Sequence, residues 1–220
     1  MHDEGMASDA TEFWKQRHDI TPSADTDEGP DGYRLVLLAE VTDPDVLSAC
    51  ERICGTLDRF ECFDASPSSV MHITAKLFDT EVEPSTTGIE NPSPAVKRVD
   101  GVVSNVVSEY EPFDVELPRL NLFPDVVYGE VADGGQLTGL NRRICDYDGI
   151  VTLDRDGEKF IPHLTFGYFG NDRDFGALVE FLEVNRELQL PTVPIEEVSL
   201  VAYEVGGHPP TYNHLKTYEL

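Results

Sequence analysis

The triplet His-x-Thr occurs twice in this chain, and both copies lie inside apolar runs that predict β-strands. The first copy spans His72 to Thr74 and the second spans His163 to Thr165. Side chains alternate between the two faces of a strand, so the His and the Thr of each copy share one face. The chain must therefore fold in a way that lets two strands each present an imidazole beside a hydroxyl.

The same alternation assigns one further residue to each polar face. Lys76 is predicted to share the face of the first triplet, and Gly167 the face of the second. On that face Lys76 would reach a substrate phosphate, or it would extend from the end of the strand into water. The sequence leaves these two interpretations open.

A single His-x-Thr triplet would be weak evidence for a function. A lone strand His is commonly buried and bonded to the backbone, and short motifs also match by chance. The repetition of the triplet in the same strand context favours the functional interpretation. We therefore interpret His72 and His163 as parts of one site.

Predicted strands and helices alternate twice around the triplets. A strand is predicted over 33–41, and Asp43 followed by Pro44 favours the start of a helix that runs to about residue 60. Further strands are predicted over 113–122, 125–131, 198–205 and near the C-terminus, further helices over 95–110, 134–146 and 172–188, and a loop over 80–94. This order indicates an α+β fold with two pseudo-symmetric lobes. Each lobe is expected to have an antiparallel-rich sheet flanked by helices, and the lobes are expected to face each other across a central groove.

Residues 1–30 differ from the rest of the chain, because they are polar and rich in acids. We expect an acidic N-terminal arm that is either disordered or packed on the body of the protein. Phe13 and Trp14 favour packing, since large aromatic side chains are seldom left in water. Residues 31–220 are then expected to form a single bilobal domain.

The charge of the chain is extreme. It has 42 Asp and Glu against 16 Lys and Arg, a formal net charge of −26. The acids are spread along the chain rather than gathered at one end, which is typical of adaptation to high salt, where their repulsion is screened. We expect a halophilic archaeal source. A long RNA duplex would be repelled by this field, so any nucleic-acid partner is expected to be short, an RNA end or a nucleotide.

The sequence indicates neither a membrane span nor a secretory signal. It has no apolar run of about 18 residues, and residues 1–10 are acidic rather than basic and then apolar. We therefore expect a cytoplasmic protein that does not bind membranes, and we expect a monomer.

The cysteines indicate no metal site. They form no Cys-x-x-Cys pair and have no companion His at zinc-ligand spacing. They are interpreted as reduced thiols in the core: Cys50, Cys54, Cys62 and Cys145. No metal and no cofactor is expected.

Together, the triplets and their context resemble the two-histidine phosphoesterase superfamily, in particular its branch of RNA 2',3'-cyclic phosphodiesterases and 2'-5' RNA ligases. The resemblance covers about residues 33–220 and rests first on the two triplets. Five weaker features support it: the opening strand over 33–41, Leu122-Phe123-Pro124 before a predicted strand, Pro162 directly before the second His, the closing strand over 198–205, and the segment 206–212 before the final strand. The chain departs from the family pattern in its long acidic N-terminal stretch and in Lys76, where relatives tend to place an apolar residue.

The resemblance implies a chemistry that suits these residues. Opening a cyclic phosphate needs a base for the attacking oxygen and an acid for the departing one, and an imidazole that titrates near about pH 6.5 serves as either. We expect His72 and His163 to fill these roles, without a prediction of which is the base. Thr74 and Thr165 are expected to donate their hydroxyls to the phosphate oxygens. Tyr212 would stack on a base or pack in the final hairpin.

The predicted function is a metal-independent phosphodiesterase that opens 2',3'-cyclic phosphate ends of RNA or nucleotides, with reversible 2'-5' RNA ligation as a second reaction of the same site. Two alternatives stay open. One is a phosphodiesterase for 2'-5' oligonucleotides or ADP-ribose cyclic phosphates. The other is a non-catalytic module that uses the triplets only to bind a nucleotide.

Overall fold

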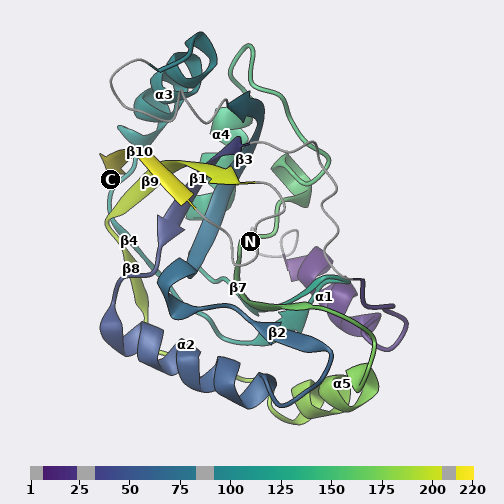
Figure 1. Ribbon diagram of the computed structural model, residues 1–220. Coiled ribbons are helices and arrows are strands. Elements are labelled where there is room, and N and C mark those ends of the chain that lie inside the picture. The colour runs from purple at the N-terminus through teal and green to yellow at the C-terminus, as the bar shows by residue number, and fades with distance from the viewer. Residues whose placement is uncertain (1–6, 24–32, 83–91, 205–211) are drawn as a thin grey trace.

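The computed structural model describes residues 7–23, 33–82, 92–204 and 212–220 of the chain (Figure 1). Its helices are α1 (Ala7–Lys15), α2 (Pro44–Leu57), α3 (Pro94–Val107), α4 (Gln136–Cys145) and α5 (Phe175–Val184), with two short 3-10 turns, η1 (Ser68–Val70) and η3 (Gly157–Lys159). Its strands are β1 (Tyr33–Glu40), β2 (Phe63–Ala65), β3 (His72–Val82), β4 (Phe113–Val115), β5 (Leu120–Leu122), β6 (Val126–Glu130), β7 (His163–Phe169), β8 (Val193–Ile195), β9 (Glu197–Glu204) and β10 (Tyr212–Glu219).

Eight of the described strands form one antiparallel sheet. Its order is β10-β9-β1-β3-β7-β6-β5, and β2 also pairs with β7, whereas β4 and β8 form a separate two-stranded sheet. The strands that carry the triplets, β3 and β7, are neighbours that pair at Ile73 and Leu164. The predicted α+β class and antiparallel pairing are confirmed. The two triplets lie in one continuous sheet, however, and not in a separate sheet for each lobe.

The two faces of this sheet are covered differently. Leu35 and Leu37 of β1 belong to the main core, which also contains the buried side chains of α2, α3, α4 and α5. Val36 and Leu38 alternate with them along β1 and belong to a smaller apolar cluster on the opposite face. These four helices therefore cover one face, and the polar side chains of the triplets lie on the other.

Helix α2 begins where the sequence predicts. The Asp43 carboxylate accepts hydrogen bonds from the backbone N–H of Asp45 at 2.8 Å and of Val46 at 3.0 Å, and Pro44 is the first helical residue. These contacts satisfy N–H groups that have no partner within the helix. The cap fixes how the chain turns from β1 into α2 at the end of the strand beside the first triplet.

A β-bulge in β3 exchanges the faces of the strand after Thr74. Thr74 pairs with Leu38 of β1, whereas Lys76 pairs with Leu37, so Ala75 is one extra residue in β3. Paired residues share a face, and Leu37 points into the main core. Lys76 therefore faces the helices, and the prediction that it shares the face of His72 and Thr74 is wrong.

The second triplet is followed by an equivalent bulge. Thr165 pairs with Tyr128 of β6 and Gly167 pairs with Val127, which leaves Phe166 as the extra residue in β7. Val127 belongs to the main core, so Gly167 also faces the helices, contrary to the prediction. A bulge directly after the Thr is thus common to both strands.

Gly167 has a packing role at this position. A Cβ atom there would lie 2.4 Å from the backbone oxygen of Asp64 and 2.4 Å from the ring of Phe63, both on β2. No side chain fits in that space without a shift of the strand. The glycine therefore allows β2 to pair closely with β7.

The N-terminal arm packs on the body of the protein over its described residues, 7–23. The ring of Phe13 contacts Phe123 edge-on with centroids 4.8 Å apart, and the guanidinium of Arg186 lies 4.0 Å from the centre of the Trp14 ring. The backbone oxygen of Ala10 accepts a hydrogen bond from the Asn121 side chain at 2.8 Å. The predicted docking of Phe13 and Trp14 is confirmed.

Several element boundaries differ from the predictions. The strand expected over 113–122 is broken into β4 and β5, because β4 pairs with β8 and β5 pairs with β6. The strands β2 and β8 were not predicted, α5 is shorter than 172–188, and β3 extends into the expected loop to Val82. The rest of that loop (83–91), the segment 205–211 and parts of the N-terminal arm lie outside the described residues. Across the described ranges, no helix has the length and apolar character needed to cross a bilayer.

Candidate active site

The two triplets are related by a local twofold axis. In an antiparallel pair such an axis passes between paired residues, here Ile73 and Leu164. Each His directly precedes its paired residue and each Thr directly follows it, so the axis relates His to His and Thr to Thr. His72 and His163 are then diagonal neighbours. In a regular ladder, the Cα atoms of such neighbours are about 7 to 8 Å apart. Both paired residues are fully buried in the main core, which leaves the polar side chains on the other face.

Both imidazoles are held in the same way. The Nδ1 atom of His72 lies 2.8 Å from the backbone oxygen of Val70, and Nδ1 of His163 lies 2.8 Å from that of Ile161. A carbonyl oxygen only accepts, so Nδ1 carries the proton in each ring. This bond fixes the ring orientation and leaves Nε2 of each neutral ring as a proton acceptor.

The first half-site consists of His72, Thr74 and the polar groups beside them. The Tyr212 hydroxyl lies 3.3 Å from Nδ1 of His72, and the two rings meet edge-on with centroids 5.2 Å apart. Tyr212 also packs on Tyr203 across the final hairpin, at 5.9 Å between ring centroids. Glu40 of β1 is the register partner of His72. The hairpin-packing interpretation of Tyr212 is confirmed, and the structure adds the contact with His72.

The second half-site consists of His163, Thr165 and an aromatic enclosure. Phe123 meets the His163 ring edge-on at 5.2 Å and Tyr128 meets it at 5.4 Å, and these two aromatic rings stack on each other at 4.2 Å. Tyr128 is fully buried, and its hydroxyl has no hydrogen-bond partner among the described residues. His163 is therefore surrounded by more apolar surface than His72.

A buried carboxylate lies beside the second half-site. Glu130 of β6 is the register partner of His163 and is nearly buried. It accepts hydrogen bonds from Arg119 at 3.0 Å, Arg186 at 2.8 Å and Asn121 at 2.9 Å. Because Arg186 lies over Trp14 and Asn121 bonds to Ala10, the same cluster fastens α1 beside this half-site.

The electrostatic surroundings lower the pKa of both imidazoles below 6.5. Burial is the main cause in each case, and the bond from Nδ1 to the backbone oxygen opposes it. The charge of His163 lowers the pKa of His72 further, and that of Arg155 lowers the pKa of His163 further. In the free protein at neutral pH, both rings are therefore mostly neutral.

Lys76 is the predicted site residue that the structure places elsewhere. Its side chain is fully buried on the helix-covered side and forms an ion pair with Asp156. The bulge at Ala75 therefore excludes both predicted uses, the contact with a substrate phosphate and the extension into water. The two Thr residues, by contrast, are half-buried and remain on the face of the imidazoles.

Several neighbours of the imidazoles were not predicted. Phe123 carried a sequence signal as part of Leu122-Phe123-Pro124, but only the packing shows its contact with His163. Glu40 and Glu130 are identified as partners of the two His residues only by the strand register.

The cysteines are free thiols. Burial raises the pKa of Cys50 to about 11 and that of Cys54 to about 12, which makes both thiols poor nucleophiles. Burial in the core is confirmed for these two and for Cys62, whereas Cys145 is only half-buried. In the described part of the chain, no group of His, Cys, Asp or Glu is arranged to hold a metal ion.

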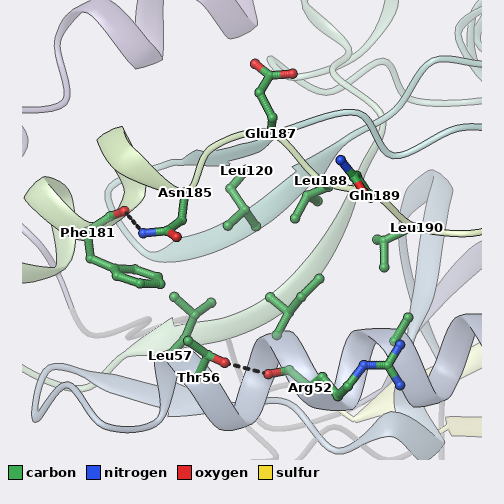
Figure 2. Close-up of a pocket in the computed structure, with 12 residues that line it drawn as sticks. Arg52, Thr56, Leu57, Leu120, Phe181, Asn185, Glu187, Leu188, Gln189 and Leu190 are labelled. Carbon is green, nitrogen blue, oxygen red and sulfur yellow. Dashed lines mark hydrogen bonds between the residues drawn. The ribbon is translucent and has the colours of Figure 1, made fainter.

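A pocket of about 370 Å³ lies away from the triplets (Figure 2). Its walls come from α2, from Phe181 and Asn185 at the end of α5, and from the segment that follows, including Leu188. Leu57 and Leu120 in its wall belong to the main core. The pocket therefore lies on the helix side of the sheet, and the imidazoles lie on the other side.

The chain belongs to the 2'-5' RNA ligase superfamily, whose sequence profile matches residues 46–207. This match includes both triplets and ends before β10. The N-terminal arm lies outside it.

Individual relatives agree with this membership. The chain is similar to an RNA 2',3'-cyclic phosphodiesterase of Methanothermobacter thermautotrophicus, with 25% identity over 130 residues, 57% of this chain and 70% of the relative. Among solved structures, it is similar to E. coli LigT complexed with 3'-AMP, with a TM-score of 0.61, 16% identity, and coverage of 86% of this chain and 98% of that chain. It is equally similar to the protein TT0787 of Thermus thermophilus, with a TM-score of 0.61, 18% identity, and coverage of 85% and 97%. The solved structures support the fold.

Proposed function

We propose that this protein is a phosphodiesterase that opens 2',3'-cyclic phosphates at the ends of short RNAs or on nucleotides. The observation that carries the proposal is the arrangement of two imidazoles about a local twofold axis on one face of the sheet, each bound through Nδ1 to a backbone oxygen and with no hydrogen bond from Nε2 to a described residue. Two proton-transfer groups placed in this way reach one phosphorus from two sides. Membership of the superfamily and the similarity to an RNA 2',3'-cyclic phosphodiesterase support the reaction class.

The two imidazoles divide the proton transfers between them. A neutral imidazole takes a proton from water through Nε2, and the water oxygen forms a bond to phosphorus. The bond from phosphorus to one ribose oxygen breaks in line with this attack. The protonated imidazole gives its proton to that ribose oxygen. The products are a phosphomonoester and a ribose hydroxyl, and the two imidazoles have exchanged their protonation states.

The hydroxyls of Thr74 and Thr165 donate to the non-bridging oxygens of the phosphate. Negative charge is held on these oxygens throughout the transfer, so fixed donors beside them lower the barrier. The four side chains alone supply the base, the acid and the phosphate contacts, and the scheme therefore has no step that requires a metal ion.

The same two proton transfers also join RNA. When a 5'-hydroxyl takes the place of water, it attacks the cyclic phosphate, the 3'-oxygen leaves, and a 2'-5' phosphodiester forms. The reverse reaction cleaves that bond. The net charge of −26 favours short RNA ends or nucleotides over long RNA in either direction.

Turnover in molar potassium chloride tests this proposal. The substrates are 2',3'-cyclic AMP, a 2'-5'-linked dinucleotide and an ADP-ribose cyclic phosphate, with and without EDTA. We expect 2',3'-cyclic AMP to be opened at the same rate in EDTA, and turnover to be lost in His72→Ala and His163→Ala. His18→Ala is the matched control, because this exposed His bonds to Glu183 on α5. Saturable binding without product would identify a nucleotide-binding module instead. Turnover of the ADP-ribose cyclic phosphate alone would show that the substrate is that nucleotide and not a 2',3'-cyclic phosphate.

A further inference from the structure

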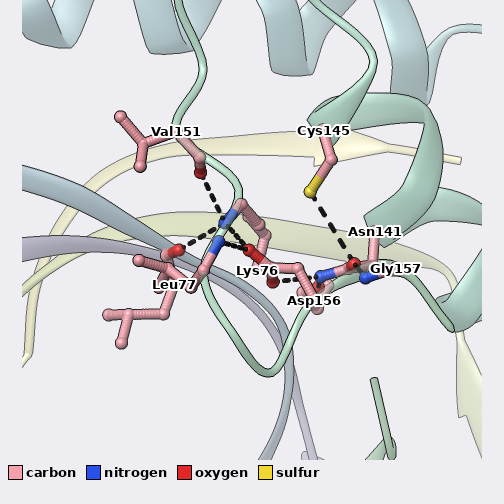
Figure 3. A network of polar contacts seen from close by, with 9 residues as sticks. Lys76, Leu77, Asn141, Cys145, Val151, Asp156 and Gly157 are labelled. Carbon is pink, nitrogen blue, oxygen red and sulfur yellow. Dashed lines mark hydrogen bonds and ion pairs between the residues drawn. The ribbon is translucent and has the colours of Figure 1, made fainter. Parts of the chain in front are cut away.

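A buried network of charges connects the strand of the first triplet with the loop that leads to the second (Figure 3). Lys76 follows the bulge in β3 and has no exposed surface. Its ammonium group donates to the Asp156 carboxylate, to the backbone oxygen of Leu77 at 2.8 Å and to that of Val151 at 3.2 Å. All three donor positions of the ammonium are therefore used inside the protein.

Asp156 and Asn141 complete the network (Figure 3). The second oxygen of Asp156 accepts from the Asn141 amide at 3.0 Å, and the oxygen bound to Lys76 also accepts from the backbone N–H of Leu153 at 2.6 Å. Asn141, on α4, donates as well to the backbone oxygen of Ala75 at 2.9 Å and accepts from the N–H of Gly157 at 3.0 Å. Every bond of this network thus ends on β3 between Ala75 and Leu77, on α4 or on the loop 151–157.

Burying this ion pair costs desolvation free energy, so the pair is a poor way to fill space in the core. Burial acts to raise the pKa of Asp156, but the hydrogen bonds from Lys76, Asn141 and Leu153 outweigh it and hold this pKa below its ordinary value. A buried ion pair gains little over apolar side chains of equal volume, because both charges must leave water. Apolar side chains, however, form no directional hydrogen bonds to backbone groups. The bonds fix individual backbone groups of the bulge and of the loop relative to each other.

Those backbone groups adjoin both half-sites. The oxygen of Ala75 belongs to the residue directly after Thr74. The loop continues through η3 to Ile161, whose backbone oxygen holds the ring of His163. Over the described residues, β3 and β7 pair with each other at a single position, so their own ladder gives little further control of how the half-sites are spaced.

We propose that Lys76, Asp156 and Asn141 are positioning residues that set the placement of the His163 half-site relative to Thr74. The role rests on the proposed function, because it concerns the distance over which two imidazoles and two hydroxyls share one phosphate. None of the three side chains touches substrate. They act through the backbone of the bulge and of the loop that precedes β7.

The test replaces both charges of the pair at once. Lys76→Met alone leaves a buried carboxylate without its cation and is expected to lower the melting temperature strongly. The double variant Lys76→Met/Asp156→Asn leaves no unpaired charge, so it is expected to recover most of that loss. Its kcat on 2',3'-cyclic AMP is nevertheless expected to stay about 10- to 100-fold below wild type with little change in KM, because small displacements of reacting groups slow the chemical step.

The matched control removes an ion pair on the surface. Lys216 binds Asp100 at 2.6 Å between β10 and α3, with both side chains partly exposed. Lys216→Met/Asp100→Asn makes the same chemical change as the double variant and is expected to keep the wild-type kcat. A folded Lys76→Met/Asp156→Asn protein that also keeps the wild-type kcat would overturn the positioning role.

A binding measurement separates this inference from the proposed function. Inorganic phosphate is titrated into wild type and the double variant while the ring protons of His72 and His163 are followed by NMR. If wild type turns over no cyclic phosphate, the proposed function fails. The positioning role then still predicts a weaker phosphate response in the double variant, and an unchanged response of both rings would contradict it.

Discussion

The two half-sites share one backbone plan and differ in what surrounds it. In both, a His-x-Thr strand segment ends in a bulge, and Nδ1 of the His donates to a backbone oxygen two residues earlier. The imidazole of the first half-site lies against a Tyr hydroxyl and pairs in register with Glu40, which is half-exposed and bound to His214 at 3.4 Å. The imidazole of the second lies in an aromatic enclosure next to a nearly buried, fully bonded carboxylate.

The comparison distinguishes what sets the position of the two imidazoles from what sets their pKa. The pairing of Ile73 with Leu164 and the axis between them relate two imidazoles, which in the proposed mechanism share one phosphate. The unsymmetric neighbours then give the two imidazoles different nearby charges, since the charge of His163 acts on His72 and that of Arg155 acts on His163. In the proposed mechanism the two imidazoles hold opposite protonation states, although the two strands place them symmetrically.

Loss of either imidazole is expected to have the largest effect. His72→Ala and His163→Ala should each lower kcat about 10²- to 10⁴-fold, since each removes one proton-transfer group. The double variant should be little worse than either single variant, because the two groups act as one unit. Steady-state rates on 2',3'-cyclic AMP measure this. A single variant that retains most of its activity would show that the half-sites do not share a phosphate.

Loss of a hydroxyl is expected to have a smaller effect that is similar in both half-sites. Thr74→Val and Thr165→Val each remove one donor to a charged oxygen, which corresponds to about 10- to 100-fold in kcat/KM. The comparison of the two variants tests the twofold relation directly. If one substitution is neutral and the other is severe, the phosphate is held by one half-site only.

Disturbance of the N-terminal arm is expected to affect only the second half-site, and only slightly. Phe13 supports Phe123, which supports the ring of His163. Phe13→Ala removes one aromatic contact and should lower kcat about 2- to 10-fold. Thr11→Ala, an exposed position on the same helix, is the control. Equal activities of the two variants would show that the arm does not contribute to this half-site.

The pH dependence is expected to differ from that of exposed histidines. Both imidazoles have a pKa below 6.5 in the free protein, so each gains its proton only at lower pH. The active form needs one neutral and one protonated ring, and its population peaks between the two apparent pKa values. The profile of kcat/KM should therefore have its maximum below about pH 6.5. A maximum above about pH 7.5 would contradict the lowered pKa values.

The sequence predicted the parts of this site that depend on local pattern. The alternation of apolar and polar residues identified both triplet strands, Asp43 and Pro44 identified the start of α2, and the aromatic character of Phe13 and Trp14 indicated that the arm packs. Each of these features depends on residues that are close together in the chain. The same is true of the bond from each Nδ1, although its acceptor was not predicted.

The parts that were missed depend on pairing between distant segments. A bulge is defined only against a partner strand, so the exchange of faces after Thr74 could not be read from β3 alone, and Lys76 was placed on the wrong face. Glu130 was not recognised because its position opposite His163 depends on the register of β6 and β7. The break between β4 and β5 likewise follows from the pairing of β4 with β8, nearly 80 residues later.

The central claim, that both imidazoles meet one phosphate, is tested most directly by NMR titration with adenosine 2'-monophosphate in molar potassium chloride. The ring protons of His72 and His163 are followed together as the nucleotide is added. We expect both signals to shift with one common dissociation constant, and we expect the shift of the remaining ring to be lost in His72→Ala and in His163→Ala. A shift confined to one imidazole, or two different dissociation constants, would contradict a shared phosphate.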